Sequence, residues 1–218
     1  MAKKYLGQNF LFDPSILARM VRVAALSPED TVVEIGPGPG RLTALLAGQV
    51  KKVIAIELDE VLYTRLTGEL SQYDNVALVH GDALSYPYET LEEFKVVANI
   101  PYYITTPLLF KLLAYKDRLG SITVTVQKEV AERIVARPRG KEYGILSLMV
   151  QYHAHPKIEF IVPKGAFRPV PKVDSAVLHM VMHKKPPVTV RDERLFFRLI
   201  KTAFSQRRKT LANALKAL

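Results

Sequence analysis

Cysteine is absent from this chain of 218 residues. Its absence excludes disulfide bonds, thiolate sites for zinc or iron–sulfur clusters, and every reaction that needs a cysteine nucleophile. Long apolar runs are absent too, since no segment approaches the ~18–20 apolar residues of a membrane-spanning helix. With 49% hydrophobic and 24% charged residues, the composition is that of a globular protein.

The N-terminal segment lacks the sustained apolar stretch of a signal peptide. It reads MAKKYLGQNFLFDP, and the polar residues Gln8 and Asn9 interrupt its apolar residues. We therefore expect a cytoplasmic protein without membrane contact. The length allows one sizeable core with a small appendage, and we expect a monomer.

Acidic residues are scarce at the C-terminal end. Residues 184–218 hold ten of the 31 Lys and Arg side chains but only two of the 21 acidic ones, a net charge of +8 against +2 for residues 1–183. A near-neutral body with a basic tail favours a polyanionic partner such as nucleic acid. The alternative is a solvated basic helix that binds nothing.

Short β-branched segments alternate with helical ones, which predicts βαβ units and a mostly parallel sheet. The apolar character of the strands is that of strands buried on both faces. Strands are predicted at Thr31–Ile35, Val53–Glu57, Val76–His80, Phe94–Ala98 and Ser121–Gln127. Helices are predicted at Arg41–Gln49, Glu60–Leu70, Pro107–Tyr115 and Lys128–Ala136.

The pattern changes after Arg137. Lys157–Val162 and Val173–His183 are predicted strands, joined by a Pro-rich turn at 163–172 without a helix between them. The short connection predicts an antiparallel hairpin at the edge of the sheet. A linker at Lys184–Val188 then leads to a basic helical segment.

A glycine-rich loop follows the first predicted strand. Gly36 and Gly38, in the sequence GPGPG at 36–40, let the backbone turn sharply and let a ligand touch the main chain. The loop does not fit G-x-G-x-x-G, and its two prolines remove backbone donors that a pyrophosphate would need. An acid, Glu34, also precedes it. S-adenosylmethionine, which has no phosphate and carries a positive sulfonium, fits this loop better than a dinucleotide.

Acidic residues end the next two strands. Glu57 is placed to accept hydrogen bonds from both hydroxyls of a ribose, and Asp82 to accept from an adenine amine. Both lie at the carboxyl edge of the sheet, where ligands of open α/β sheets bind. The alternatives are a solvated strand-end acid at Glu57 and a helix cap at Asp82.

The most informative segment is Asn99-Ile100-Pro101-Tyr102, directly after the fourth strand. An adenine amine is a poor nucleophile because its lone pair is delocalised into the ring. The Asn99 side-chain oxygen and the Ile100 carbonyl can accept both of its N–H bonds and accommodate the charge that develops during attack. Pro101 fixes the turn, and Tyr102 offers a face for the base to stack on. Rate would come from in-line positioning without a strong base; the alternative is a turn with Tyr102 in the core.

Phe167, in the Pro-rich turn, is placed to close the other face of an extruded base. The alternative is an aromatic anchor in the core. No metal site is expected, because the histidine pairs at 153 and 155 and at 179 and 183 lack nearby carboxylates.

Together these segments resemble the KsgA family of small-subunit rRNA adenine N6,N6-dimethyltransferases. The matching segments are LGQNFL at 6–11, EIGPGPG at 34–40, NIPY at 99–102, PKVDSAV at 171–177 and AFSQRRKT at 203–210. The glycine loop is generic to many methyltransferases, and Asn-x-Pro-Tyr is shared with other adenine methylators. The Gln-Arg-Arg-Lys-Thr stretch favours this family over the antibiotic-resistance rRNA methylases.

The resemblance implies a Rossmann-like class I fold, with a mostly parallel seven-stranded sheet and a late antiparallel hairpin. It implies a methyltransferase domain with an N-terminal arm at 1–185 and a helical C-terminal domain at 186–218. Family chains usually continue through more helices, so we expect that C-terminal domain to be incomplete. It also implies that the substrate is a pair of adjacent adenosines in a hairpin loop near the 3′ end of small-subunit rRNA, in ribosome assembly intermediates.

Residue roles also follow from the resemblance. Asn9 and Leu11 would frame S-adenosylmethionine from the N-terminal arm, and Tyr102 and Phe167 would sandwich the target base. The residues expected to contact the cofactor are Gly36, Gly38, Glu57, Asp82 and Asn99.

Two other functions remain open at this point. DNA adenine and protein glutamine methyltransferases use a similar Asn/Asp-Pro-Pro-Tyr loop, but they usually have proline where this chain has Ile100. A non-catalytic RNA-binding assembly or transcription factor could share the fold. The intact loop from Asn99 to Tyr102 and the acids of the cofactor site argue against that function.

Overall fold

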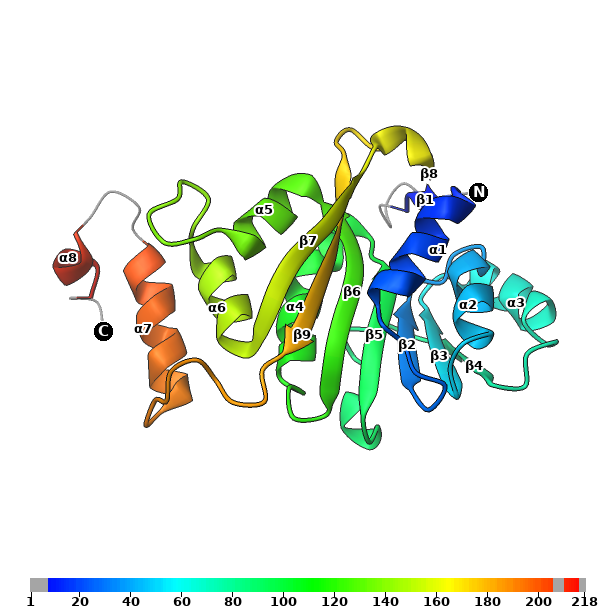
Figure 1. Ribbon diagram of the computed structural model, residues 1–218, viewed down its shortest axis with the longest axis horizontal. Coiled ribbons are helices and arrows are strands. Elements are labelled where there is room, and N and C mark those ends of the chain that lie inside the picture. The colour runs from blue at the N-terminus through cyan, green and yellow to red at the C-terminus, as the bar shows by residue number, and fades with distance from the viewer. Residues whose placement is uncertain (1–7, 206–209, 216–218) are drawn as a thin grey trace.

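The computed structural model describes residues 8–205 and 210–215 (Figure 1). The strands are β1 (Phe10–Leu11), β2 (Thr31–Ile35), β3 (Lys52–Glu57), β4 (Val76–His80), β5 (Phe94–Asn99), β6 (Leu119–Gln127), β7 (Ala154–Val162), β8 (Phe167–Arg168) and β9 (Ser175–Met182). The α-helices are α1 (Pro14–Val23), α2 (Arg41–Ala47), α3 (Glu60–Glu69), α4 (Thr105–Leu113), α5 (Lys128–Val135), α6 (Ile145–His153), α7 (Glu193–Ser205) and α8 (Leu211–Leu215). Short 3₁₀ turns include η3 (Tyr102–Ile104) and η4 (Lys164–Ala166).

The central sheet has seven strands in the order β4-β3-β2-β5-β6-β9-β7. Neighbouring strands from β4 to β6 are parallel, whereas β9 is antiparallel to both β6 and β7. The predicted α/β sheet and the late hairpin at its edge are therefore confirmed. The chain order reverses between β2 and β5, and a crevice at such a switch point is where open α/β sheets bind ligands.

Helices cover both faces of the sheet and form two cores (Figure 1). Successive residues of a strand point to opposite faces, so Val32 packs in the core with α1 and α2 while Val33 packs in the core with α4. Val96 and Val97 in β5 divide in the same way. This double burial explains why the parallel strands are apolar throughout.

An N-terminal arm crosses the carboxyl edge of the sheet before α1 begins. Its strand β1 pairs antiparallel with β8, and this small sheet sets Leu11 opposite Phe167. The arm ends at Asp13, whose side chain accepts from the Ser15 N–H at 2.9 Å and caps α1, with Pro14 at the first helical position. Neither this small sheet nor α1 was predicted, and the Pro-rich turn that was predicted at 163–172 contains η4 and β8.

The C-terminal half differs from the prediction in two further places. Helix α6 precedes β7 where no helix was predicted, and its apolar sequence ILSLMVQYH has no side-chain cap to mark its start. The predicted basic helix is divided into α7 and α8, with Thr210 outside both. Parts of two predicted segments, residues 6–7 of the first motif and 206–209 of the last, lie outside the described residues.

No helix among the residues that the structure describes is both long enough and apolar enough to cross a membrane.

We predict that Leu112→Ala destabilises the protein by about 2–5 kcal/mol, because Leu112 on α4 is fully buried against the sheet and its loss leaves a cavity. Urea denaturation measures the change. Leu45→Ala on α2, where the side chain is 37% exposed, serves as the control and should cost less than half as much. Equal losses would contradict this account of the core.

Candidate active site

The glycine loop between β2 and α2 has a backbone that side chains disfavour. Gly36 and Gly38 have φ angles of +66° and +57°, in the left-handed region that glycine adopts readily. A Cβ at Gly38 would lie 2.7 Å from Cδ1 of Phe10. The absence of that Cβ therefore lets the ring of the N-terminal arm lie directly on the loop.

Glu57 stands at the end of β3 and turns its carboxylate toward the glycine loop. Oε2 accepts from the Gly38 N–H at 3.3 Å, and Oε1 accepts from the Asp59 N–H at 2.9 Å. Burial raises the pKa of Glu57, and these backbone donors oppose the rise. With 4% of its surface exposed, Glu57 is not a solvated strand-end acid.

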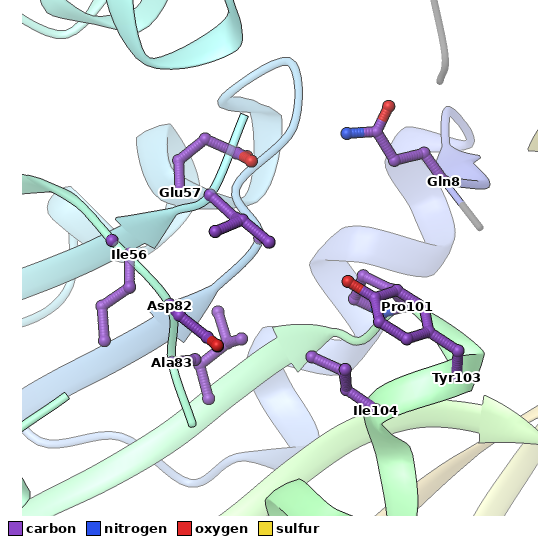
Figure 2. A pocket seen from close by; sticks show the side chains of 12 residues that line it. Gln8, Ile56, Glu57, Asp82, Ala83, Pro101, Tyr103 and Ile104 are labelled. Carbon is purple, nitrogen blue, oxygen red and sulfur yellow. The ribbon is translucent and has the colours of Figure 1, made fainter. Parts of the chain in front are cut away.

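A cavity of about 420 Å³ opens at the carboxyl ends of the parallel strands. Figure 2 shows Glu57 and Asp82 on one side of it, Pro101 and Tyr103 on the other, and Gln8 above. Its lining residues are Gln8, Ile35, Gly36, Ile56, Glu57, Leu58, Gly81, Asp82, Ala83, Pro101, Tyr103 and Ile104. The cavity combines an apolar slot with two carboxylates, which suits a ligand that has a flat ring and hydroxyl donors.

Two smaller cavities adjoin the first. The second, of about 390 Å³, shares Gly36, Glu57 and Pro101 with it and adds Asn99 and Tyr102. The third, of about 290 Å³, shares Gly36 and Asn99 with the second. Residues that were predicted at separate strand ends therefore line one connected site.

Asp82 lines the first cavity, as predicted for a cofactor-binding acid, and it caps no helix, because a turn follows β4. Its Oδ1 accepts from the Leu84 N–H at 2.8 Å and so turns the chain after β4. The side chain remains exposed and lines the first cavity. The alternative of a helix cap is therefore not found, and the bond to Leu84 stabilises a turn instead.

Asn99 at the end of β5 is held by the N-terminal arm. Its Nδ2 donates to the carbonyl of Asn9 at 2.9 Å. That bond uses one of the two amide N–H groups and fixes the orientation of the side chain, so Oδ1 is held as an acceptor, and no hydrogen bond to it occurs among the described residues. The arm thereby sets which end of Asn99 acts in the site.

Tyr102 follows two residues after the buried Ile100, within η3. Its hydroxyl lies 2.6 Å from Oγ of Ser175, the first residue of β9. The ring is half-buried and lines the second cavity, so it is not simply a core residue. Burial raises the pKa of Tyr102 further above neutrality, and a tyrosine hydroxyl is already uncharged near pH 7.

Phe167 does not stand where the prediction placed it. The side chain is fully buried in the core with α1 and α2, and it lines none of the three cavities. Pairing of β8 with β1 turns it inward beside Leu11, which is 4% exposed and lines the third cavity. In this structure Phe167 is a core anchor, as the alternative had it, and its ring offers no exposed face to a base.

Glu34 belongs to the site, although the sequence analysis gave it no role there. It lies in β2, is 1% exposed, and lines the third cavity with Asn99. Burial raises the pKa of Glu34 to about 8, and its Oε2 has no hydrogen-bond partner in the part of the chain that the structure describes. The signal in the sequence was an acid inside an otherwise apolar strand, directly before the glycine loop.

Comparison with known proteins identifies the family of the chain. Residues 1–218 match the family described as ribosomal RNA adenine dimethylase. The chain belongs to the ribosomal RNA adenine dimethylase family. Membership confirms the predicted resemblance, the Rossmann-like methyltransferase fold and the enzyme class that uses S-adenosylmethionine.

The curated relatives of this family member include ribosomal RNA small subunit methyltransferase A from Clostridium acetobutylicum, which is 47% identical over 99% of this chain and 79% of its own length. The corresponding protein from Moorella thermoacetica is also 47% identical, again over 99% of this chain and 79% of its own length.

Solved structures of other methyltransferases share the architecture. A dimethyladenosine transferase from Plasmodium falciparum has a TM-score of 0.85 and 31% identity, over 95% of this chain and 74% of that one. The 23S rRNA methyltransferase ErmE has a TM-score of 0.79 and 29% identity, over 96% of this chain and 84% of that one.

The residues of the site fit S-adenosylmethionine. Glu57 and Asp82 supply acceptors for hydroxyl and amine donors, and Glu34 supplies a buried oxygen that lacks a partner. Arg41 is the one basic residue among the described residues that line the three cavities. A site so poor in cations suits a cationic, phosphate-free cofactor.

We predict that Glu34→Gln changes how stability depends on pH. A carboxyl whose folded pKa is raised binds a proton in the folded state but not in the unfolded state between pH 4.5 and about 8. The free energy of unfolding of the wild type should therefore fall by up to ~1.4 kcal/mol per pH unit relative to the variant across this window. Urea denaturation of the cofactor-free protein at pH 5.5, 6.5 and 7.5 tests this.

The exposed acid Glu60 provides the control for that measurement. Glu60→Gln should differ from the wild type by the same amount at each pH. A difference between the wild type and Glu34→Gln that stays constant with pH would mean that Glu34 is ionised in the folded protein.

Proposed function

We propose that this chain methylates the N6 amine of two adjacent adenosines near the 3′ end of small-subunit rRNA, and that each amine receives two methyl groups. The observation that carries the proposal is the bond from Asn99 Nδ2 to the Asn9 carbonyl. It leaves an oriented acceptor on a residue that lines two of the three connected cavities. An acceptor fixed before the substrate arrives costs no reorganisation during the reaction.

S-adenosylmethionine supplies an electrophilic methyl group when it is bound. We assign its adenosyl part to the first cavity, where Glu57 accepts from the ribose and Asp82 from the adenine amine. Gly36 and Gly38 let the cofactor approach the main chain, and Asn9, Leu11 and Asn99 frame its other end.

The target adenine is held by the loop after β5. Oδ1 of Asn99 and the carbonyl of Ile100 accept the two N–H bonds of the amine, and Pro101 fixes the turn between them and Tyr102. The Tyr102 ring stacks on the base, an interaction worth about 1–3 kcal/mol. The bond from its hydroxyl to Ser175 holds the ring in place.

No residue of the site needs to act as a strong base. The amine becomes acidic only after it is alkylated, so its proton can leave to water in a later step. Tyr102, whose pKa burial raises, stays neutral and positions the base. The contribution of the chain to rate is therefore orientation of the amine.

The basic C-terminal segment at 186–218 is assigned to RNA docking. On α7, Arg194, Arg198 and Lys201 are exposed and recur every three or four residues, which places them on one face. None of the three has an ion-pair partner among the described residues. Arg133 on α5, in contrast, pairs with Glu129 and Glu142. We propose that the protein works as a cytoplasmic monomer on ribosome assembly intermediates.

Methyl transfer to undermethylated small ribosomal subunits tests this function. Labelled S-adenosylmethionine is supplied, and the modified nucleoside is identified by mass spectrometry. We expect N6,N6-dimethyladenosine at two adjacent positions in one hairpin loop. Label that appears only in DNA or in protein, or at no adenine, would overturn the proposal.

We predict that Asn99→Ala lowers kcat by about 10²–10³-fold, because it removes a fixed acceptor from the developing charge. Cofactor affinity, measured by calorimetry, should change by less than about fivefold, since Glu57 and Asp82 remain. Full activity in this variant would remove Asn99 from the mechanism.

Glu57→Gln is the matched contrast on the other side of the site. It keeps the shape of the side chain but weakens its acceptors, so it should reduce cofactor affinity by about 10-fold or more. If both variants changed affinity alike, the division between base-holding and cofactor-holding residues would be wrong.

A further inference from the structure

A separate groove lies on the outer side of the glycine loop. It encloses about 670 Å³ of open space and is lined by Phe10, Phe12, Pro39, Leu62, Arg65, Arg168 and Pro169. Phe10 and Pro39 also line the third cavity of the active site, to which Asn99 contributes. The groove and the active site therefore share a wall.

The groove offers flat apolar surfaces on a fixed frame. Phe12 is half-buried, and the guanidinium carbon of Arg41 lies 4.7 Å from its ring centroid. Arg41 Nη1 also donates to the Phe12 carbonyl at 3.2 Å, and the Phe12 N–H donates to the Ala166 carbonyl at 3.1 Å. A ring held at the backbone and on one side loses little freedom when a flat group stacks on it.

The groove also carries positive charge, and none of the described residues that line it is acidic. Arg65 has 59% of its side chain exposed, and its ion pair with Glu69 one turn along α3 is exposed too. Such a pair is worth little in water, so Arg65 can exchange it for another anion. Arg168 bonds the carbonyls of Gly165 and Phe167 through Nη1, and it has no acidic partner among the described residues.

We propose that this groove binds the nucleotide that adjoins the target adenosine in the RNA strand, with its base against Phe12 and its phosphate on Arg65 and Arg168. Proteins bind unstacked RNA bases by stacking them on aromatic rings, and they bind the RNA backbone through arginines. The proposal rests on the proposed function, because the neighbouring adenosine is the one that binds in the active site. According to this proposal, the enzyme recognises a base next to the target adenosine as well as the target itself.

RNA binding by Phe12→Leu tests the proposal. This variant keeps an apolar side chain and removes the flat ring. The probe is a fluorescent RNA hairpin with the target adenosines in its loop, compared with hairpins that have an abasic position on either side of the target. We expect the variant to bind the intact hairpin about 10-fold more weakly. On one of the abasic hairpins the variant and the wild type should agree within about twofold, because the stacking partner is already missing.

A second variant tests the charge independently of the ring. Arg65→Glu should weaken binding of the intact hairpin by about 10-fold and reduce the dependence of affinity on salt. Lys51→Glu, an equal charge reversal at an exposed residue just before β3 and so at the opposite edge of the sheet, is the control and should bind within about twofold of the wild type. Thermal unfolding confirms that each variant is folded.

Two results would contradict the proposal that the groove binds the adjoining nucleotide. One is a Phe12→Leu penalty that is the same on intact and on both abasic hairpins. The other is an Arg65→Glu variant that binds like Lys51→Glu. Failure of the proposed function is recognised separately, because it is a lack of methyl transfer by the wild type, whereas these measurements report RNA affinity.

Discussion

The crevice that holds the site exists because the chain leaves the carboxyl ends of β2 and β5 in opposite directions. From β2 the chain turns back through the glycine loop into α2, and from β5 it turns through η3 into α4. The helices lie on opposite faces of the sheet, which leaves a crevice between the two strand ends. The other features of the site all face this opening.

The N-terminal arm turns that opening into a defined pocket. Phe10 lies on Gly38, and the Asn9 carbonyl binds Asn99, so one short segment contacts both strand ends. Its own position depends on β8, which comes from the distant Pro-rich turn. The site is therefore closed by residues from the beginning and the end of the domain, although its floor comes from consecutive βα units.

The buried acids of the site lower the stability of the folded protein and favour ligand binding. Glu34 and Glu57 are both almost fully buried, and burial raises both pKa values. A hydrophobic residue at Glu34 would pack without that cost. We therefore attribute the two acids to the cofactor, whose donors and positive charge would offset the cost when it is bound.

The mostly parallel sheet, the late hairpin and most of the site could be predicted from sequence, because each rests on a local pattern, whereas the order of the strands was not predicted. Periodicity and the glycine loop place Glu57, Asp82 and Asn99 at the carboxyl ends of parallel strands of one sheet. The start of α1 was predictable as well, since Asp13 and Pro14 are strong N-terminal signals. Helix α6 was not, because an apolar nine-residue segment is equally consistent with a strand. The inward turn of Phe167 was also out of reach, since it follows from pairing of β8 with residues far away in the chain.

The antiparallel direction of β9 affects when the base-binding site around Tyr102 is completed during synthesis. An antiparallel strand begins at the edge where its parallel neighbours end, so Ser175 arrives beside Tyr102. During synthesis, β2 to β6 can pair before β9 has left the ribosome. Until then the hydroxyl of Tyr102 has no Ser175 to bind. A nascent chain could thus have paired strands β2 to β6 while the ring of Tyr102 still lacks its hydrogen bond. The bond would form only when β9 emerges.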